Sequence, residues 1–224
     1  MTTAASPDLI TTREGWHRVA EHVLAAGQFA AAGTIRLRPA PGGFATVVGV
    51  DGRQLAVDGT DLAVLVGVDG RRSTPLTTLG EVAAFAGVEP GLRGSYSPTT
   101  SADPDAPLRV DATAARLLAG WFALGDTALR RFAEGLGPSP EPVLWPEHFD
   151  LGLTVDAVNY GCSPGDDAIP EPYLYVGPHA GPPGPDPFWN VPFGAALTAD
   201  SIRDTDDAVA FFERGRALGR GAGG

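Results

Sequence analysis

Residues 34–70 read TIRLRPAPGGFATVVGVDGRQLAVDGTDLAVLVGVDG and carry the strongest fold signal in the chain. Apolar and polar residues alternate with period two at its start, as they do in a half-buried strand. Asp-Gly pairs then recur at 51–52, 58–59 and 69–70, and this dipeptide is typical of type I′ hairpins. The stretch predicts an antiparallel meander of about four strands, at 34–38, 44–50, 54–57 and 62–68.

Helical periodicity flanks the meander on both sides. Thr11 and Glu14 have the spacing of a capping box, and the apolar residues that follow recur on one helical stripe, which predicts a helix to about Ala32. Further helices are predicted at 78–86, from Asp111 to 136 with a break at Gly125, and at 205–218. Further strands are predicted at 149–155, 158–162 and 173–176.

These elements predict an α+β fold. The N-terminal meander and the C-terminal strands are expected to join into one antiparallel sheet, packed by three to four helices. We expect a single domain over residues 1–224. Its sub-regions are a helix–meander–helix part (1–137) and an acidic, Pro- and aromatic-rich module with a terminal helix (138–224).

Charge and composition exclude several function classes. The chain has a net charge of −11, one cysteine and no lysine, so a P-loop, a lysine Schiff base and a multi-cysteine zinc site are excluded. The negative charge argues against nucleic-acid and membrane partners. The sequence shows no signal peptide and no membrane-spanning run, which predicts a cytoplasmic protein.

The acidic residues gather in one block. Residues 132–202 contain ten acids and no base, and hold most of the net charge. Within this block, Glu147, His148 and Asp150 place an imidazole and two carboxylates in four residues. A strand would put His148 and Asp150 on one face, whereas a helical turn would pair Glu147 with Asp150. Either pair could hold a divalent cation.

A second group of candidates lies around the turn Ser163-Pro164-Gly165-Asp166. Tyr173 and Tyr175 should share one face of the strand that follows, and tyrosines beside carboxylates suit a cationic or polyhydroxylated ligand. A third group, Phe188-Trp189-Asn190-Val191-Pro192-Phe193, either plugs a core edge or lines a ligand cleft. The predicted ligand-binding residues are Trp145, Asn159, Tyr173, Tyr175 and Trp189.

Cys162 and the two histidines of the first helix are predicted to have no role in a functional site. Cys162 has no catalytic signature around it and is predicted to be a buried, inert thiol. His17 and His22 are five residues apart, too far round an α-helix to share a face, and are predicted to lie on a solvated helix surface.

Four motifs resemble an uncharacterised family of actinobacterial proteins: GTIRLRPAPGGF (33–44), LWPEHFDLG (144–152), NYGCSPGDDAIPEPYLYVGP (159–178) and FWNVPFGA (188–195). LWP-x-HFD, the SPGD turn and PEPY-x-YV are also similar to a broader bacterial family of unknown function. The resemblance implies one whole-chain unit and transfers no site residue.

The favoured function is a small-ligand or partner-binding domain that uses this acidic–aromatic surface. The alternative is a hydrolase or lyase that depends on a divalent metal ion, with Glu147 as general base. Its metal ligands would be His148, Asp150 and one of Asp166, Asp167 or Glu171. A glycosidase-like acid pair, Glu147 with Glu171, is a third hypothesis.

Overall fold

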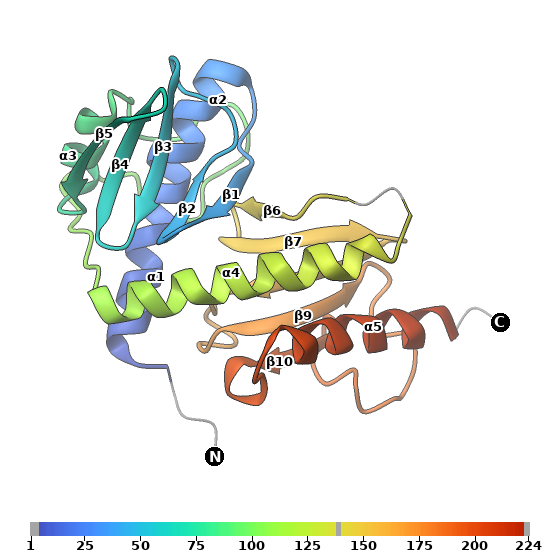
Figure 1. Cartoon of the computed structure of the whole chain (residues 1–224). Helices are drawn as coiled ribbons and strands as arrows, with labels where there is room; N and C mark the ends of the chain where they lie inside the picture. Colours follow the sequence, from blue (N-terminus) through green and yellow to red (C-terminus); the bar gives the residue numbers. More distant parts are fainter. Residues whose placement is uncertain (1–4, 138–139, 222–224) are drawn as a thin grey trace. The chain divides into compact units, whose positions relative to one another are not determined.

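A computed structural model describes residues 5–137 and 140–221 (Figure 1). The chain divides into two compact units, and each unit is built from stretches that are not contiguous in the sequence. The meander unit comprises Ala5–Gly120 and Leu144–Phe149. The described residues of the second, C-terminal unit are 121–137, 140–143 and 150–221. The two units contain antiparallel strands with helices beside them, which confirms the α+β class; a single domain stays a prediction.

The meander has five strands, one more than predicted. They are β1 (Leu37–Ala40), β2 (Gly43–Thr46), β3 (Arg53–Asp58), β4 (Asp61–Val66) and β5 (Gly70–Pro75), paired in chain order. Leu144 of the short β6 (Val143–Trp145) pairs with Leu37 on the other side of β1. Asp51 and Gly52 both have positive φ, 49° and 75°, as a type I′ turn requires.

One continuous helical rod supplies part of the core of the meander unit. It consists of α1 (Pro7–Val19), the π-helix η1 (Ala20–Ala25) and α2 (Ala26–Ala32), and α3 (Leu79–Ala86) is a separate helix. Trp16 is fully buried, meets Phe44 edge-on at 5.6 Å, and donates its indole N–H to the Gly59 carbonyl at 3.1 Å. This bond satisfies the buried polar atom of a large apolar side chain.

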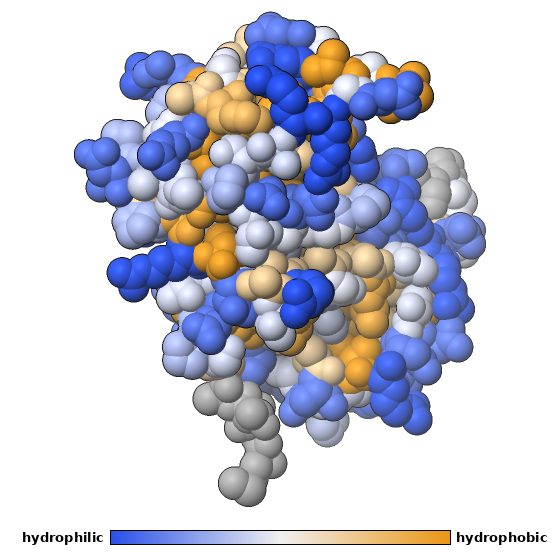
Figure 2. All heavy atoms as spheres, turned by 60° about the vertical axis from the view of Figure 1, so that its left-hand side comes forward, coloured by the Kyte–Doolittle hydropathy of each residue, from blue (hydrophilic) through white to orange (hydrophobic). Residues whose placement is uncertain are grey.

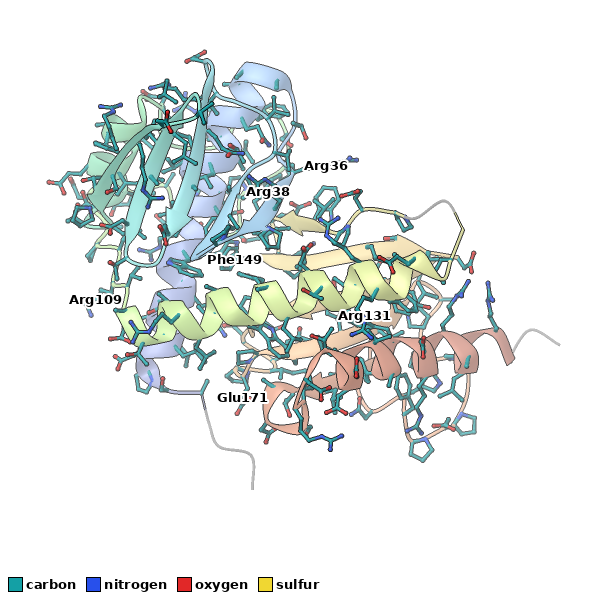
Figure 3. The ribbon with its side chains drawn as sticks, in the orientation of Figure 1. Arg36, Arg38, Arg109, Arg131, Phe149 and Glu171 are labelled. Atoms are coloured by element: carbon teal, nitrogen blue, oxygen red, sulfur yellow. The ribbon has the colours of Figure 1, made fainter. Side chains whose placement is uncertain are left out.

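The C-terminal unit packs two helices on a four-stranded sheet. Its strands are β7 (Asp150–Val155), β8 (Val158–Ser163), β9 (Tyr173–Pro178) and β10 (Ala195–Thr198), in the order β10-β9-β8-β7. The helices are α4 (Ala112–Glu134), which begins in the meander unit, and α5 (Thr205–Gly221). A short 3-10 turn, η2 (Ala199–Ser201), follows β10. Arg131 of α4 bonds Asp206 of α5 at 2.7 Å (Figure 3).

Two local predictions about helices were wrong. The first helix begins at Pro7, because the Ser6 side chain accepts from the Leu9 N–H, and Thr11 and Glu14 lie inside the helix. Gly125 does not break α4. A Cβ there would lie 2.6 Å from Cys162, so glycine allows the helix to approach β8 closely.

Counting the α1–η1–α2 rod once, the described residues contain four helices, as predicted. None of the helices in the ranges 5–137 and 140–221 has the length and apolar character needed to cross a lipid bilayer.

Candidate functional site

The sheet of the C-terminal unit has two chemically different faces. One face packs on α4 and α5: Leu174 and Val176 are fully buried, and Phe132, Tyr160 and Phe212 form an aromatic cluster with centroid distances of 4.6–6.1 Å. Cys162 lies on this face, and burial raises the pKa of its thiol, in agreement with the prediction of an inert cysteine. The other face carries small and polar residues and both tyrosines of β9.

Tyr175 occupies the centre of that second face. Gly161 is its register partner on β8, and Gly152 pairs with Gly161 from β7. A Cβ on Gly161 would lie 2.2 Å from the tyrosine ring, and one on Gly152 would lie 2.9 Å from its hydroxyl oxygen. The ring therefore lies across this glycine pair, and its hydroxyl donates to Asp150. Burial and the Asp150 charge raise the Tyr175 pKa well above 10.

Tyr173 is held by the turn that precedes β9. Its hydroxyl donates to Asp166 Oδ2 at 2.6 Å, while Asp166 Oδ1 accepts from the backbone N–H groups of Ala168 and Ile169. The ring centroids of Tyr173 and Tyr175 are 6.3 Å apart. The predicted shared face of the two tyrosines is confirmed, and each has a carboxylate partner. We call Asp150, Asp166, Tyr173 and Tyr175 the acid–tyrosine cluster.

The other predicted ligand-binding residues contact residues outside this cluster. Asn159 is on the same face, but at the far end of β8, where it bonds Thr154 and His179. Trp189 meets Phe188 edge-on at 5.0 Å, and Phe188 packs against Phe211 of α5.

The ring of Trp145 belongs to the meander unit, where the Arg36 guanidinium lies 5.7 Å from its centre. Phe188 is buried against Phe211 of α5, and Phe188 and Asn190 also line a pocket of about 370 Å³, so the third sequence group has features of both roles predicted for it.

The predicted metal ligands do not form a metal centre. Residues 146–149 form a turn in which Phe149 has φ 51°, so the strand alternation expected for His148 and Asp150 is interrupted. His148 and Asp167 are exposed, and Glu171 lies on the loop before β9 (Figure 3). Among the described residues, no group of three or more His, Cys, Asp or Glu side chains could hold a metal ion. Glu147, the predicted general base, lies in the same turn, and the Thr99 hydroxyl donates to its backbone carbonyl.

A buried polar cluster in the meander unit was missed. The prediction of solvated histidines was wrong: His22 is 1% exposed, and Glu21 between them is fully buried. The hydrogen bonds of a π-helix join residues five apart, and η1 brings His17 and His22 to the same side. The Nε2 atoms of both rings lie 3.8 Å from Glu21 Oε2. The five-residue spacing of the two histidines is the sequence signal for this cluster. It indicates a shared side only for a π-helix, whereas the period of an α-helix separates the two residues.

Glu21 holds a surface segment against this helix. Its carboxylate accepts from the backbone N–H groups of Thr99 and Thr100 at 3.0 and 2.8 Å, and from the hydroxyls of Tyr96 and Thr100. His22 Nε2 lies 3.0 Å from the Thr100 carbonyl, and its buried Nδ1 has no hydrogen-bond partner among the described residues. These contacts anchor a long loop, and every polar atom of the Glu21 carboxylate is used.

We expect the stability of the protein to fall in mild acid through His17. Burial is the main cause that lowers the His17 pKa below 6.5. The unfolded chain then binds a proton before the folded one does, so the contribution is complete above about pH 6.5 and is lost as the pH falls below it. Urea unfolding at a series of pH values would measure this slope. His17→Gln, which can still donate to the Pro146 carbonyl, should flatten it; equal slopes in both proteins would contradict the assignment.

A scan against protein-family models finds no match, and neither a search of curated proteins nor one of solved structures finds a relative. The acid–tyrosine cluster is therefore interpreted from its own geometry.

Proposed function

We propose that this protein is a cytoplasmic small-ligand-binding protein, and that a small organic cation binds over Tyr175. The observation that carries the proposal is the position of this ring across Gly152 and Gly161, beside the carboxylate of Asp150. A half-buried aromatic ring that is fixed by backbone below and by a hydrogen bond at its hydroxyl loses little freedom when a ligand binds.

The charge around the ring favours a cation. Asp150 and Asp166 lie at the two tyrosines, and the stretch 132–202 contains no Lys or Arg. A positive group above an aromatic face gains about 0.5–2 kcal/mol from the ring, and nearby carboxylates add to this attraction. The same charges would repel phosphates and carboxylates. Polyhydroxylated ligands can also bond carboxylates, but they would gain less from the net charge.

Choline and its uncharged isostere 3,3-dimethylbutan-1-ol test the proposal, with glucose as a polyhydroxylated probe. We expect choline to bind measurably by calorimetry and to shift the backbone amide signals of Gly152 and Gly161 in NMR spectra. Tyr175→Leu should weaken binding about tenfold, whereas Tyr175→Phe keeps the ring and should retain most of it. Asp150→Asn should weaken choline binding through the lost charge.

Trp189→Leu is the matched control, because Trp189 contacts Phe188 and should leave choline binding unchanged. Thermal unfolding of each variant separates loss of binding from loss of fold. Equal binding of choline and its uncharged isostere would overturn the proposal that the ligand is a cation. Binding of glucose alone would indicate a polyhydroxylated ligand instead. A Trp189→Leu variant that loses binding while Tyr175→Leu keeps it would overturn the site.

A further inference from the structure

The hydrogen-bond acceptors near Tyr175 can distinguish one class of organic cation from another. Figure 2 shows separate groups of hydrophobic side chains, in orange, among hydrophilic ones, in blue, on the face that it draws. Exposed apolar groups of this kind are common on proteins and do not by themselves identify a ligand. Acceptor oxygens are more informative, because each bond that an oxygen already accepts within the protein is one that an ammonium N–H group has to displace.

Asp166 already accepts bonds from three donors of the protein. Its Oδ1 accepts from the backbone N–H groups of Ala168 and Ile169, both at 2.7 Å, and its Oδ2 accepts from the Tyr173 hydroxyl at 2.6 Å. These bonds hold the carboxylate in the turn that precedes β9. An ammonium N–H group would therefore reach the Asp166 oxygens only in competition with donors that the fold itself supplies.

The surroundings of the Tyr175 ring are engaged in the same way. The Tyr175 hydroxyl donates to Asp150 Oδ2, so the carboxylate beside the proposed ligand is bonded by the ring that the ligand would cover. Below the ring lie Gly152 and Gly161, and the strand of Gly161, β8, is an inner strand between β7 and β9. The backbone carbonyls of an inner antiparallel strand accept bonds from its neighbours. The backbone under the ring is therefore used by the sheet.

We propose, building on the proposed function, that the site selects a quaternary ammonium group, which carries no N–H, over a primary ammonium group, which carries three. A primary ammonium that moves from water onto Tyr175 gives up hydrogen bonds to water, and each N–H that finds no acceptor weakens binding. A quaternary ammonium has no such bonds to lose. Its methyl groups can lie on the aromatic face, while the ring and the Asp150 carboxylate attract its charge.

The Tyr175 hydroxyl determines part of this selectivity. Because it donates to Asp150 Oδ2, it competes with any ammonium N–H group for that oxygen. Tyr175→Phe removes the hydroxyl and keeps the aromatic face, so the attraction of the ring stays while the competing donor is lost. A primary ammonium should gain from this change, whereas a quaternary ammonium has no N–H with which to use the oxygen. The ratio of the two affinities therefore reports the role of the hydroxyl.

A series of ligands that differ only in N-methylation tests the proposal by calorimetry on the full chain: ethanolamine, its N-methyl and N,N-dimethyl derivatives, and choline. All four are cations at neutral pH, since aliphatic amines ionise well above it. The number of N–H groups falls by one at each step. We expect affinity to rise along the series, with choline at least about tenfold tighter than ethanolamine. In Tyr175→Phe the ratio of these two affinities should fall about fivefold.

Tyr160→Phe is the matched control, because it removes a tyrosine hydroxyl from the opposite face of the same sheet. It should leave the affinity ratio unchanged, and thermal unfolding of each variant checks that the fold is retained. Equal affinities for choline and ethanolamine, both weakened by Tyr175→Leu, would overturn the selectivity and leave the proposed cation site in place. A ratio that does not fall in Tyr175→Phe would overturn the role of the hydroxyl. Binding of none of the four compounds would overturn the proposed function, and the selectivity with it.

Discussion

Glu21→Ala should lower the free energy of unfolding by about 3–5 kcal/mol, a large part of the stability of a small domain. The side chain is fully buried and accepts from two backbone N–H groups and two hydroxyls of the segment 96–100. Removing it leaves those donors without an acceptor, and each unsatisfied buried group costs about 1–3 kcal/mol. Denaturant unfolding would measure the loss, and hydrogen exchange should show that the Thr99 and Thr100 amides lose protection.

Glu21→Gln keeps the shape of the side chain but replaces one acceptor oxygen by a donor. It should therefore cost less than Glu21→Ala, yet still disturb the Thr100 N–H and hydroxyl, which both need an acceptor. Glu14→Ala is the matched control, because Glu14 is exposed on α1 of the same rod. If Glu21→Ala and Glu14→Ala had the same free energy of unfolding, the proposal that the Glu21 carboxylate anchors the segment 96–100 would be wrong.

The fold could be predicted where local sequence determines local structure. The Asp-Gly turns and the apolar stripe on the first helix predicted the meander and its packing helix, but not all of the strand bounds: the strands predicted at 34–38 and 44–50 lie at 37–40 and 43–46. The strands β5, β6 and β10 were not predicted, because they carry little alternation of their own. β5 reads GRRSTP and is a strand because it pairs with β4 over its whole length. Pairing with a neighbour is a tertiary property that a short window of sequence does not contain.

The candidate site could be predicted only in part, for a similar reason. Period two placed Tyr173 and Tyr175 on one face, but the contact between Tyr175 and Asp150 depends on the register of three strands. The prediction that His148 and Asp150 share one face of a strand was wrong, because Phe149 between them adopts a positive φ and interrupts the alternation of the strand. The π-helix changed the helical period at His17 and His22, and sequence periodicity alone assumes the ordinary one.

The tyrosines and the absence of lysine together give the second large effect, a loss of stability in alkali. The chain contains four tyrosines, Tyr96, Tyr160, Tyr173 and Tyr175, and the pKa of each is raised above 10, in every case mainly by burial. A raised pKa means that the folded protein keeps a proton that the unfolded chain releases. The contribution of the tyrosines to stability is therefore complete below about pH 10 and is lost as the pH rises through their folded pKa values.

Tyr160 gives a measure of this loss. Its pKa is raised to about 12, and the side chain is 1% exposed, so it alone removes about 2–3 kcal/mol by the time the pH reaches its folded pKa. Because the chain has no lysine and arginine stays charged, the side chains that titrate in this range are the tyrosines and Cys162. Ultraviolet absorbance of tyrosinate at rising pH should therefore stay flat above pH 10 and then increase together with the loss of the circular dichroism signal. Tyr160→Phe should move this transition to higher pH. Tyrosinate that forms near pH 10 while the fold persists would contradict the burial of these hydroxyls, including the one that joins Tyr175 to Asp150.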